Sequence, residues 1–140
     1  MAKSLSAFLS QNAKPVEHKE VVISDRFLDV DGEPIKWEIK SITAAENQRL
    51  RDQAQKITVG AKKQQIVKFD NAVYQTNLAT KCVVFPDLNN VELQNSYHAM
   101  NAAELIGAML TPAEFDDLVN EILLLCGFED DNERVEEAKN

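Results

Sequence analysis

The segment from Thr111 to Gly127 constrains the fold most, because it carries the sequence signals of a complete amphipathic helix. It opens with Thr111-Pro112-Ala113-Glu114, which offers an N-cap hydroxyl, a proline at the first helical position and a glutamate placed to close a capping box. Gly127 stands where a C′ glycine ends a helix. Between these ends, apolar residues recur at helical spacing: Phe115, Leu118, Val119, Ile122 and Leu125. A helix of this kind must bury its stripe, so the chain needs a core beside it.

Period-two alternation predicts a β-hairpin ahead of the helices. Ile35, Trp37 and Ile39 alternate with charged residues, which is typical of a strand with one buried face and one solvated face. A strand-like segment at 20–27 and an Asp-Gly turn at 29–34 complete the hairpin. We expect Trp37 to anchor the core from the inward face.

The rest of the chain carries mostly helical signals. Thr43 and Glu46 form a predicted capping box, and the helix that they open is expected to run to about Ile57. Further predicted N-caps are Asp70, Asn90 and Asn101. The helix after Asp70 stops before Pro86, and its candidate inward residues are Ala72, Val73, Leu78, Ala79 and Cys82. The predicted fold is α+β, with an N-terminal β-hairpin followed by a mostly helical domain of four to five helices.

Three regions are expected along the chain. Residues 1–18 form an N-terminal arm, residues 19–128 a single α+β domain, and residues 129–140 an acidic tail. The tail offers little apolar area to offset the entropy of ordering, so we expect it to be mobile. In the arm, Leu5, Phe8 and Leu9 lie at helical spacing and predict a small docking helix, with a frayed terminus as the alternative.

One basic stretch interrupts an otherwise acidic chain. We expect residues 51–69 to form a solvated loop, with a binding site for an acidic partner as the sharper alternative. Lys62 and Lys63 are the candidate contacts of that site. The stretch holds five cations, Arg51, Lys56, Lys62, Lys63 and Lys68, against the single acid Asp52.

Composition excludes several classes of function. A net charge of −8 and a pI of about 4.7 repel phosphate backbones and anionic lipid, so we expect neither nucleic-acid nor membrane binding. The N-terminus lacks the apolar run of a secretory signal. Two widely spaced cysteines, Cys82 and Cys126, favour free thiols in a reducing compartment, which predicts a cytoplasmic protein.

No motif for catalysis, metal binding or cofactor binding is apparent. The segment starting at Asp29 resembles the opening of a calcium loop, but Pro34 and Lys40 occupy the positions that need glycine and glutamate. His18 and His98 have no neighbours at zinc-ligand spacing. The four glycines form no phosphate-binding loop. We therefore expect a protein without cofactor or metal that is not an enzyme.

Four groups of residues, in order along the chain, resemble the XkdN-like tail assembly chaperones of contractile-tail phages and PBSX-like prophages. One group is Phe85-Pro86-Asp87-Leu88, with 92–97 (Glu-Leu-Gln-Asn-Ser-Tyr), 103–104 and 108–110 after it, and the specificity lies in the four groups together. The others lie at 4–12, at 24–39 and at 127–140. They comprise Ser4–Leu9 with Gln11-Asn12; Ser24–Phe27 with Asp31-Gly32, Pro34 and Trp37–Ile39; and Gly127-Phe128 with Glu136–Asn140. The stretch 58–69 matches least well.

The resemblance implies a non-enzymatic role in building the phage tail. Such a chaperone binds the long helical tape measure protein, keeps it soluble and helps to recruit tail tube subunits, without a place in the mature virion. The candidate partner-binding residues are Leu5, Phe8, Leu9, Lys62 and Lys63, together with a groove beside the closing helices. Self-association stays open. The alternative function is a structural tail adaptor or completion protein that is retained in the particle.

Overall fold

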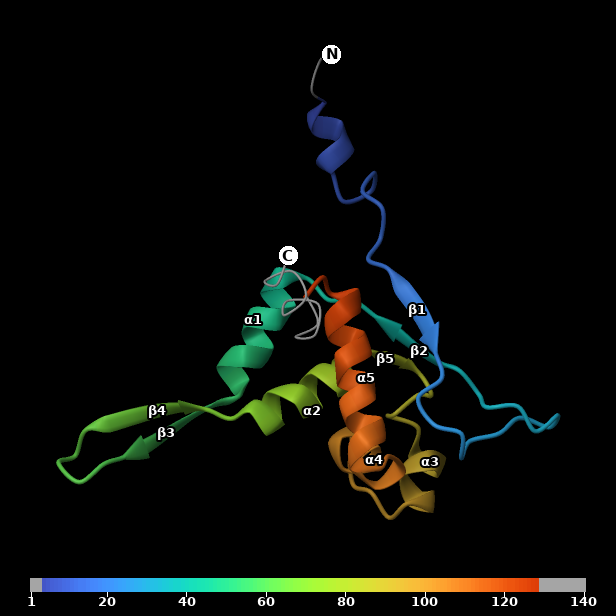
Figure 1. Ribbon diagram of the computed structural model, residues 1–140. Coiled ribbons are helices and arrows are strands. Elements are labelled where there is room, and N and C mark those ends of the chain that lie inside the picture. Colours follow the sequence, from blue (N-terminus) through green and yellow to red (C-terminus); the bar gives the residue numbers. More distant parts are fainter. Residues whose placement is uncertain (1–3, 129–140) are drawn as a thin grey trace, which may run out of the picture.

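A three-stranded antiparallel sheet and five α-helices build the body of the protein, as the computed structural model shows for residues 4–128 (Figure 1). The sheet has the order β1-β2-β5, so β2 lies in its centre. Its strands are β1 (His18–Val21), β2 (Trp37–Lys40) and β5 (Val83–Phe85). The predicted acidic tail at 129–140 lies outside the described residues. The boundaries between arm, domain and tail stay predictions.

The helices follow the sheet's first two strands and enclose its inner face. A short 3₁₀ helix, η1 (Leu5–Phe8), precedes β1. A second antiparallel pair of strands, β3 and β4, follows α1 and precedes α2 along the chain. The remaining elements are α1 (Ala44–Gln53), β3 (Gln55–Val59), β4 (Gln65–Phe69), α2 (Asn71–Cys82), α3 (Val91–Ser96), α4 (Ala102–Met109) and α5 (Pro112–Leu125). The predicted α+β class, with an N-terminal hairpin before a mostly helical region, is confirmed.

The core forms where β2 meets α2, α4 and α5. Trp37 and Ile39 are almost completely buried, whereas Glu38 and Lys40 on the other face of β2 stay half-exposed. The stripe on α5 is confirmed at its centre, because Leu118, Val119 and Ile122 are buried. The largest fully buried side chains are Trp37, Ile39, Leu78, Cys82, Leu105, Ile106, Leu118 and Ile122. Burying apolar area of this kind is the main stabilising contribution to a domain.

The helix signals locate the helix ends well. Thr43–Glu46 and Thr111–Glu114 both form complete capping boxes. Asp70, Asn90 and Asn101 each accept a hydrogen bond from a backbone N–H in the first turn. Gly127, at φ +98°, ends α5, where the Gly127 and Phe128 N–H groups donate to the carbonyls of residues 124 and 123.

The N-terminal hairpin is present, but its first strand was placed wrongly. The β1 strand covers His18–Val21 rather than 20–27, and it pairs residue for residue with β2. The chain then leaves the sheet for a long excursion through 22–36. Its tip is a turn in which the Asp29 side chain accepts hydrogen bonds from the Asp31 and Glu33 N–H groups, with Gly32 at φ +81°. This side-chain turn explains the Asp-Gly signal without a metal ion.

Residues 55–69 form a β-hairpin, so the predicted loop and the predicted helix through Ile57 are both wrong. Helix α1 ends at Gln53, and β3 pairs with β4 over five residues. The turn at 60–64 holds Lys63 at φ 57°, and the Gly60 N–H donates to the Gln64 carbonyl at 2.8 Å. The β-branched residues at 57–59 and 66–67 favour strands over helices, which the helical spacing of Ile57 concealed.

One smaller expectation around α2 fails. Ala72 is exposed, and Tyr74 is buried instead, with its ring centroid 5.6 Å from that of Phe69. Helix α2 ends at Cys82, so the prediction that it stops before Pro86 is confirmed. The chain then forms β5, which the sequence analysis did not predict and which pairs with β2 through an irregular register at Glu38/Ile39. A three-residue strand gives almost no periodic signal, because its alternation spans a single repeat.

An ion pair fastens the long excursion to the start of α5. The Arg26 Nη2 atom donates to Glu114 Oε1 and to the Met109 carbonyl, each at 2.6 Å. Glu114 also closes the capping box with Thr111. The hydrogen bond from Arg26, followed by those from Ser24 and the Thr111 backbone, lowers the pKa of Glu114 to about 2. One carboxylate therefore joins the segment after β1 to the junction between α4 and α5.

Replacing Glu114 with glutamine should lower stability in a pH-dependent way. A carboxylate whose pKa falls on folding stabilises the protein above its ordinary pKa of 4.5, and the contribution disappears as the pH falls through about 2. Glutamine keeps the capping geometry and removes only the charge. Urea denaturation should show that the variant has a lower free energy of unfolding than the native protein at pH 7, and that this difference disappears between pH 4.5 and pH 2. Glu92→Gln on α3 is the control, and a difference for Glu114→Gln that does not change with pH would contradict this assignment.

Candidate partner-binding surfaces

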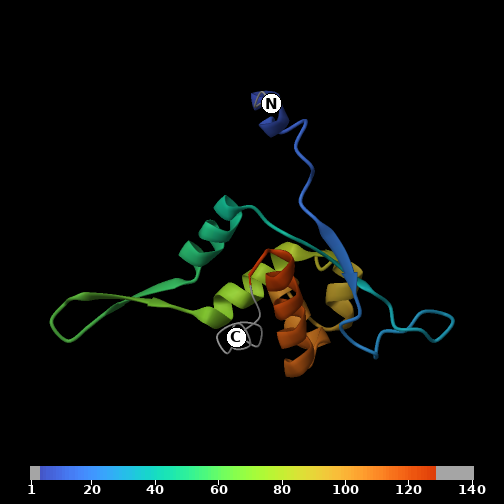
Figure 2. The same ribbon diagram turned by 45° about the horizontal axis from the view of Figure 1, so that its top comes forward.

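The N-terminal arm carries apolar side chains that the core does not use. Leu5 and Phe8 are each 81% exposed, and Leu9 is 43% exposed. The arm extends from β1 away from the sheet and helices (Figures 1 and 2). Because residues i and i+3 of a 3₁₀ helix lie one above the other, η1 presents Leu5 and Phe8 on the same side. Leu5 and Phe8 are thus brought together on a surface remote from the core, and Leu9 follows directly at the end of the helix.

The arm nevertheless has its own local structure. The Asn12 side chain donates to the Ser6 carbonyl at 2.8 Å, and the Asn12 and Ala13 N–H groups donate to the Leu9 carbonyl. Ser4, at the N-cap, makes no side-chain capping bond to the helix. These few bonds hold a turn and leave its apolar side chains in solvent.

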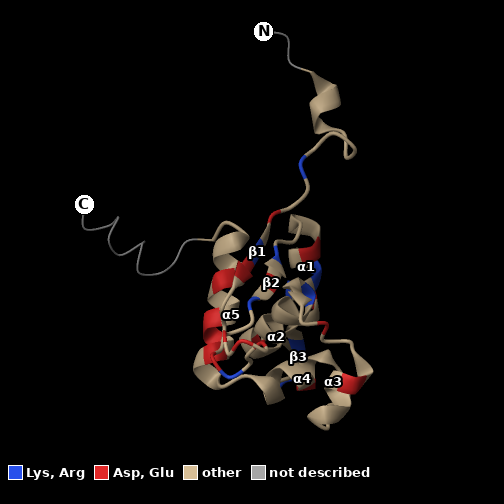
Figure 3. Cartoon of the chain, turned by 90° about the vertical axis from the view of Figure 1, so that its right-hand side faces the viewer, with Lys and Arg blue, Asp and Glu red and all other residues tan. Residues whose placement is uncertain are grey.

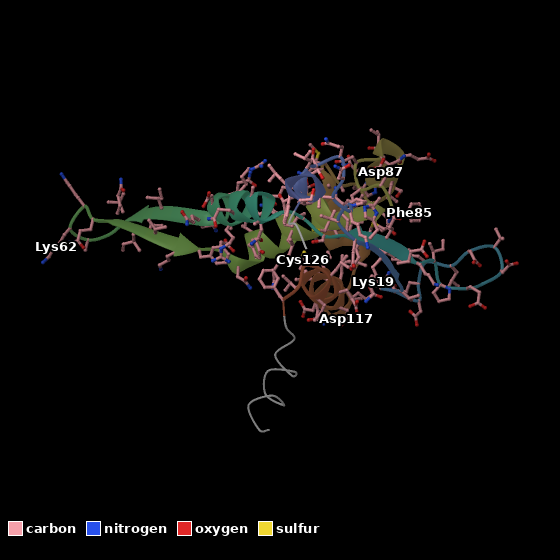
Figure 4. All side chains as sticks on the ribbon, turned by 90° about the horizontal axis from the view of Figure 1, so that it is seen from above. Lys19, Lys62, Phe85, Asp87, Asp117 and Cys126 are labelled. Atoms are coloured by element: carbon pink, nitrogen blue, oxygen red, sulfur yellow. The ribbon has the colours of Figure 1, made fainter. Side chains whose placement is uncertain are left out.

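Lys62 and Lys63 lie at the tip of the hairpin formed by β3 and β4, here called the ribbon (residues 55–69). All ten strand residues of the ribbon are exposed, and the ribbon projects from the ends of α1 and α2 (Figures 1 and 4). The arm and the ribbon point in different directions (Figures 1 and 2). The structure therefore places the five predicted contact residues in two separate projections rather than in one site.

The body carries several clefts with largely apolar walls. One, of about 300 Å³, runs along α4 and α5 with Ile106, Leu110 and Phe115 in its wall, which corresponds to the groove expected beside the closing helices. Another, of about 180 Å³, is lined almost wholly by carbon. Its walls are Phe27, Ile35, Trp37, Phe85, Pro86, Leu93 and Met109. Sequence reasoning missed this cleft, because its walls come from four segments that only the fold brings together.

A further cleft has mixed polar and apolar walls, and two of its charged groups pair with each other. It measures about 360 Å³ and includes Glu46, Arg49 and Lys81. Glu46 accepts from the Thr43 backbone, which is the main reason that its pKa is lowered, and it forms an ion pair with Lys81 at 3.3 Å. Glu46 also completes the cap of α1.

The remaining chemistry is that of a folded scaffold. Burial raises the pKa of the Cys82 thiol to about 12, so it stays protonated at neutral pH and is a poor nucleophile. Among the residues that the structure describes, no three histidine, cysteine, aspartate or glutamate side chains gather as metal ligands would. Within 4–128, no helix combines the length and apolar character that a membrane span requires.

Charge is distributed unevenly over the surface. Acidic residues gather on α5 (Figure 3). Asp116, Asp117 and Glu121 lie within two consecutive turns of this helix. Only Glu121 of these three has a cationic partner among the described residues, Lys19 at 2.9 Å. The ribbon, by contrast, holds four lysines and no acid. The body is therefore acidic and the ribbon is basic.

Comparison with known proteins identifies the group to which this architecture belongs. The model of the phage XkdN-like tail assembly chaperone proteins matches residues 5–139. Two proteins of Bacillus subtilis strain 168 are similar over most of their lengths. The phage-like element PBSX protein XkdN is 27% identical over 138 residues, covering 97% of this chain and 93% of that protein. The uncharacterized protein YqbN is 26% identical over 135 residues, covering 96% and 91%.

A solved structure supports the fold. The crystal structure of YqbN superposes with a TM-score of 0.75 at 22% identity, covering 92% of this chain and all of that one. At this identity the likeness shows the fold alone. The family match, which extends over nearly the whole chain, is the stronger finding: the chain belongs to the phage XkdN-like family of tail assembly chaperones.

Proposed function

We propose that this chaperone binds the tape measure protein, keeps it soluble in the host cytoplasm and helps to recruit tail tube subunits. The observation that carries the proposal is the arm, where Leu5 and Phe8 are 81% exposed and have no place in the core. A tape measure is a long, largely apolar helical chain that aggregates before the tube covers it. A protein that holds it needs apolar area to offer and charge to keep the complex in solution.

The arm supplies the apolar area. Fully burying a leucine or phenylalanine side chain contributes about 1.5–3 kcal/mol, so Leu5 and Phe8 together can support a reversible contact of moderate strength. The groove along α4 and α5 offers a second place where an apolar helix can lie. The acidic body supplies the solubility, since a net charge of −8 repels other copies of the complex.

Co-expression with the tape measure protein tests this function. We expect the tape measure to be largely insoluble alone and soluble when this chain is present, and the two to co-purify. An unrelated acidic protein of similar size is the control. Equal solubility with the control protein would contradict the proposal.

A chaperone of this kind is absent from the finished particle, whereas a structural adaptor or completion protein stays in it. Quantitative mass spectrometry of purified tails separates the two. We expect the tail tube protein in many copies and this chain at background level. A fixed number of copies per tail would assign the structural role instead.

A further inference from the structure

The ribbon has two chemically different faces. Residues directly opposite each other in an antiparallel pair share a face, and the register pairs Ile57 with Val67, Val59 with Gln65 and Lys56 with Lys68. One face therefore carries Ile57, Val59 and Val67, while the other carries both lysines. This arrangement gives the ribbon an apolar side and a basic side.

The apolar side is not covered by the body of the protein. Ile57, Val59 and Val67 are 65%, 73% and 57% exposed. Phe69, on the same face, is at the base of the ribbon, where Arg51 lies 4.9 Å above its ring. A two-stranded ribbon without a packed face is marginally stable in water, because it buries little apolar area. The exposed apolar side thus lacks the partner that most such ribbons have.

The base of the ribbon is firmly attached. The Asp70 N–H donates to the Ala54 carbonyl at 2.8 Å, and Lys56 pairs with Asp70 at 2.6 Å. Phe69 packs against the buried ring of Tyr74. These contacts fix the direction in which the ribbon leaves α1 and α2, so the apolar side is presented in a constant orientation.

The charges of the ribbon select the partner. Four lysines, Lys56, Lys62, Lys63 and Lys68, with no acid among residues 55–69, stand in a chain of net charge −8, which leaves −12 on the remainder. Lys56 and Lys68 lie opposite each other on the basic side, where Asp70 already pairs with Lys56. Within residues 4–128, only Lys56 of the four has an ion-pair partner. An acidic partner is attracted to the ribbon and repelled by the body.

We propose that the ribbon binds an amphipathic helix of the tape measure, laid along its apolar side, with aspartate and glutamate at the end of the helix that reaches Lys62 and Lys63 in the turn. The side chains of the face, rather than the strand edges, carry the apolar area, which favours a helix over an added strand. Five residues of strand span about 17 Å, the length of about three helical turns. The proposal rests on the proposed function, because it assigns a binding element and a segment type to the tape measure.

Nucleic acid is a poorer fit for this surface. A duplex would meet the lysines but leave Ile57, Val59 and Val67 uncovered, and the acidic body would repel its phosphates. A second copy of the chain could offer acidic side chains to the ribbon lysines. Its acidic body would, however, lie close to the acidic body of the first copy, and the two would repel each other. Both occupants are outcomes of the test.

The test measures binding of a labelled, alanine-rich helical peptide of about 18 residues, long enough to be helical, to the full-length protein. The peptide carries a leucine stripe with glutamates at one end, and a second peptide carries lysines at that end instead. We expect the glutamate peptide to bind at least about tenfold more tightly at low salt, with the preference weakening as salt is added. Equal binding of the two peptides would overturn the proposal.

Matched variants locate the binding to the ribbon. Ile57→Thr with Val67→Thr keeps β-branched residues in the strands and removes the apolar side, so we expect binding to weaken about tenfold or more. Ile66→Thr, on the opposite face, is the control and should change it less than about threefold. Lys62→Gln with Lys63→Gln should remove the preference for the glutamate peptide, whereas Lys36→Gln outside the ribbon should not.

Each contrary outcome has a clear meaning. Unchanged binding by the double threonine variant, or a DNA duplex that binds through the ribbon lysines, would overturn the ribbon proposal. Dimerisation that light scattering shows to be lost in the double variant would assign the apolar side to a second copy and also overturn it. Peptide binding through the ribbon without any effect on tape measure solubility would refute the proposed function but leave the ribbon as a site for acidic helices.

Discussion

Replacing Trp37 with alanine is expected to destabilise the protein by about 3–5 kcal/mol, the largest effect of any single substitution that we predict. Trp37 is 1% exposed and lies on the central strand β2, with the ring of Phe27 at 6.3 Å. Alanine leaves a cavity where the sheet, the long excursion and Met109 meet. Since small domains are stable by about 5–15 kcal/mol, this loss consumes much of the total.

Urea denaturation followed by far-ultraviolet circular dichroism measures the effect, because the substitution removes the protein's single tryptophan as a fluorescent probe. Val30→Ala is the matched control. Val30 lies fully exposed at the tip of the same excursion, and its truncation should change stability by less than about 0.5 kcal/mol. A loss for Trp37→Ala as small as that of the control would mean that the core does not form around β2.

Replacing Leu5 and Phe8 with aspartate is expected to abolish most tape measure binding while the fold survives. If both side chains are buried in the complex, their loss removes about 3–6 kcal/mol of binding free energy, or more than about hundredfold in affinity. The stability of the free protein should be unchanged, because both side chains are exposed and lie on the arm. Deletion of residues 1–14 should have the same two effects.

A pull-down with immobilised tape measure, paired with thermal denaturation of each variant, gives both readouts. Leu28→Asp with Val30→Asp is the control, since it adds the same charge at exposed apolar positions on a different projection. Binding that is equal for the native protein and both arm variants would remove the arm from the account. A fall in the melting temperature of the arm variants would show instead that Leu5 and Phe8 serve the fold.

The sequence predicted the parts of the fold whose signals are local and repeated. The capping boxes at Thr43 and Thr111, the stripe on α5 and the alternation around Trp37 each depend on neighbours within a few residues. Such patterns record which face of an element is buried. The α+β class and the burial of Trp37 and Ile39 therefore came from the sequence directly.

The ribbon could not be predicted in this way, because neither of its faces joins the core. The alternation at 56–59 is short, and Ile57 also fitted the helical spacing of Leu50 and Ala54. The remaining signal was the β-branched character of Thr58 and Val59 with Gly60 after them, which predicts a strand and a turn. In this short segment the β-propensity of the residues, rather than their helical spacing, matches the structure.

The candidate binding surfaces also differ in how far the sequence predicted them. Exposure of Leu5 and Phe8 followed from an apolar patch too short to form a core, whereas the cleft beside Phe85 and Pro86 depends on side chains from four separate segments. β5 was missed for a related reason, since three residues are positioned by their pairing with β2. Contacts between distant segments are a property of the fold and leave no local pattern.

A light-scattering assay tests whether this protein prevents a longer apolar helix from aggregating. Tape measure protein is diluted from denaturant into buffer that contains increasing amounts of this chain. The account predicts that scattering falls in proportion to the added chain and reaches a plateau at a fixed molar ratio, whereas the Leu5→Asp, Phe8→Asp variant has little effect. Scattering that is the same at every ratio, or that falls equally with an unrelated acidic protein, would contradict the account.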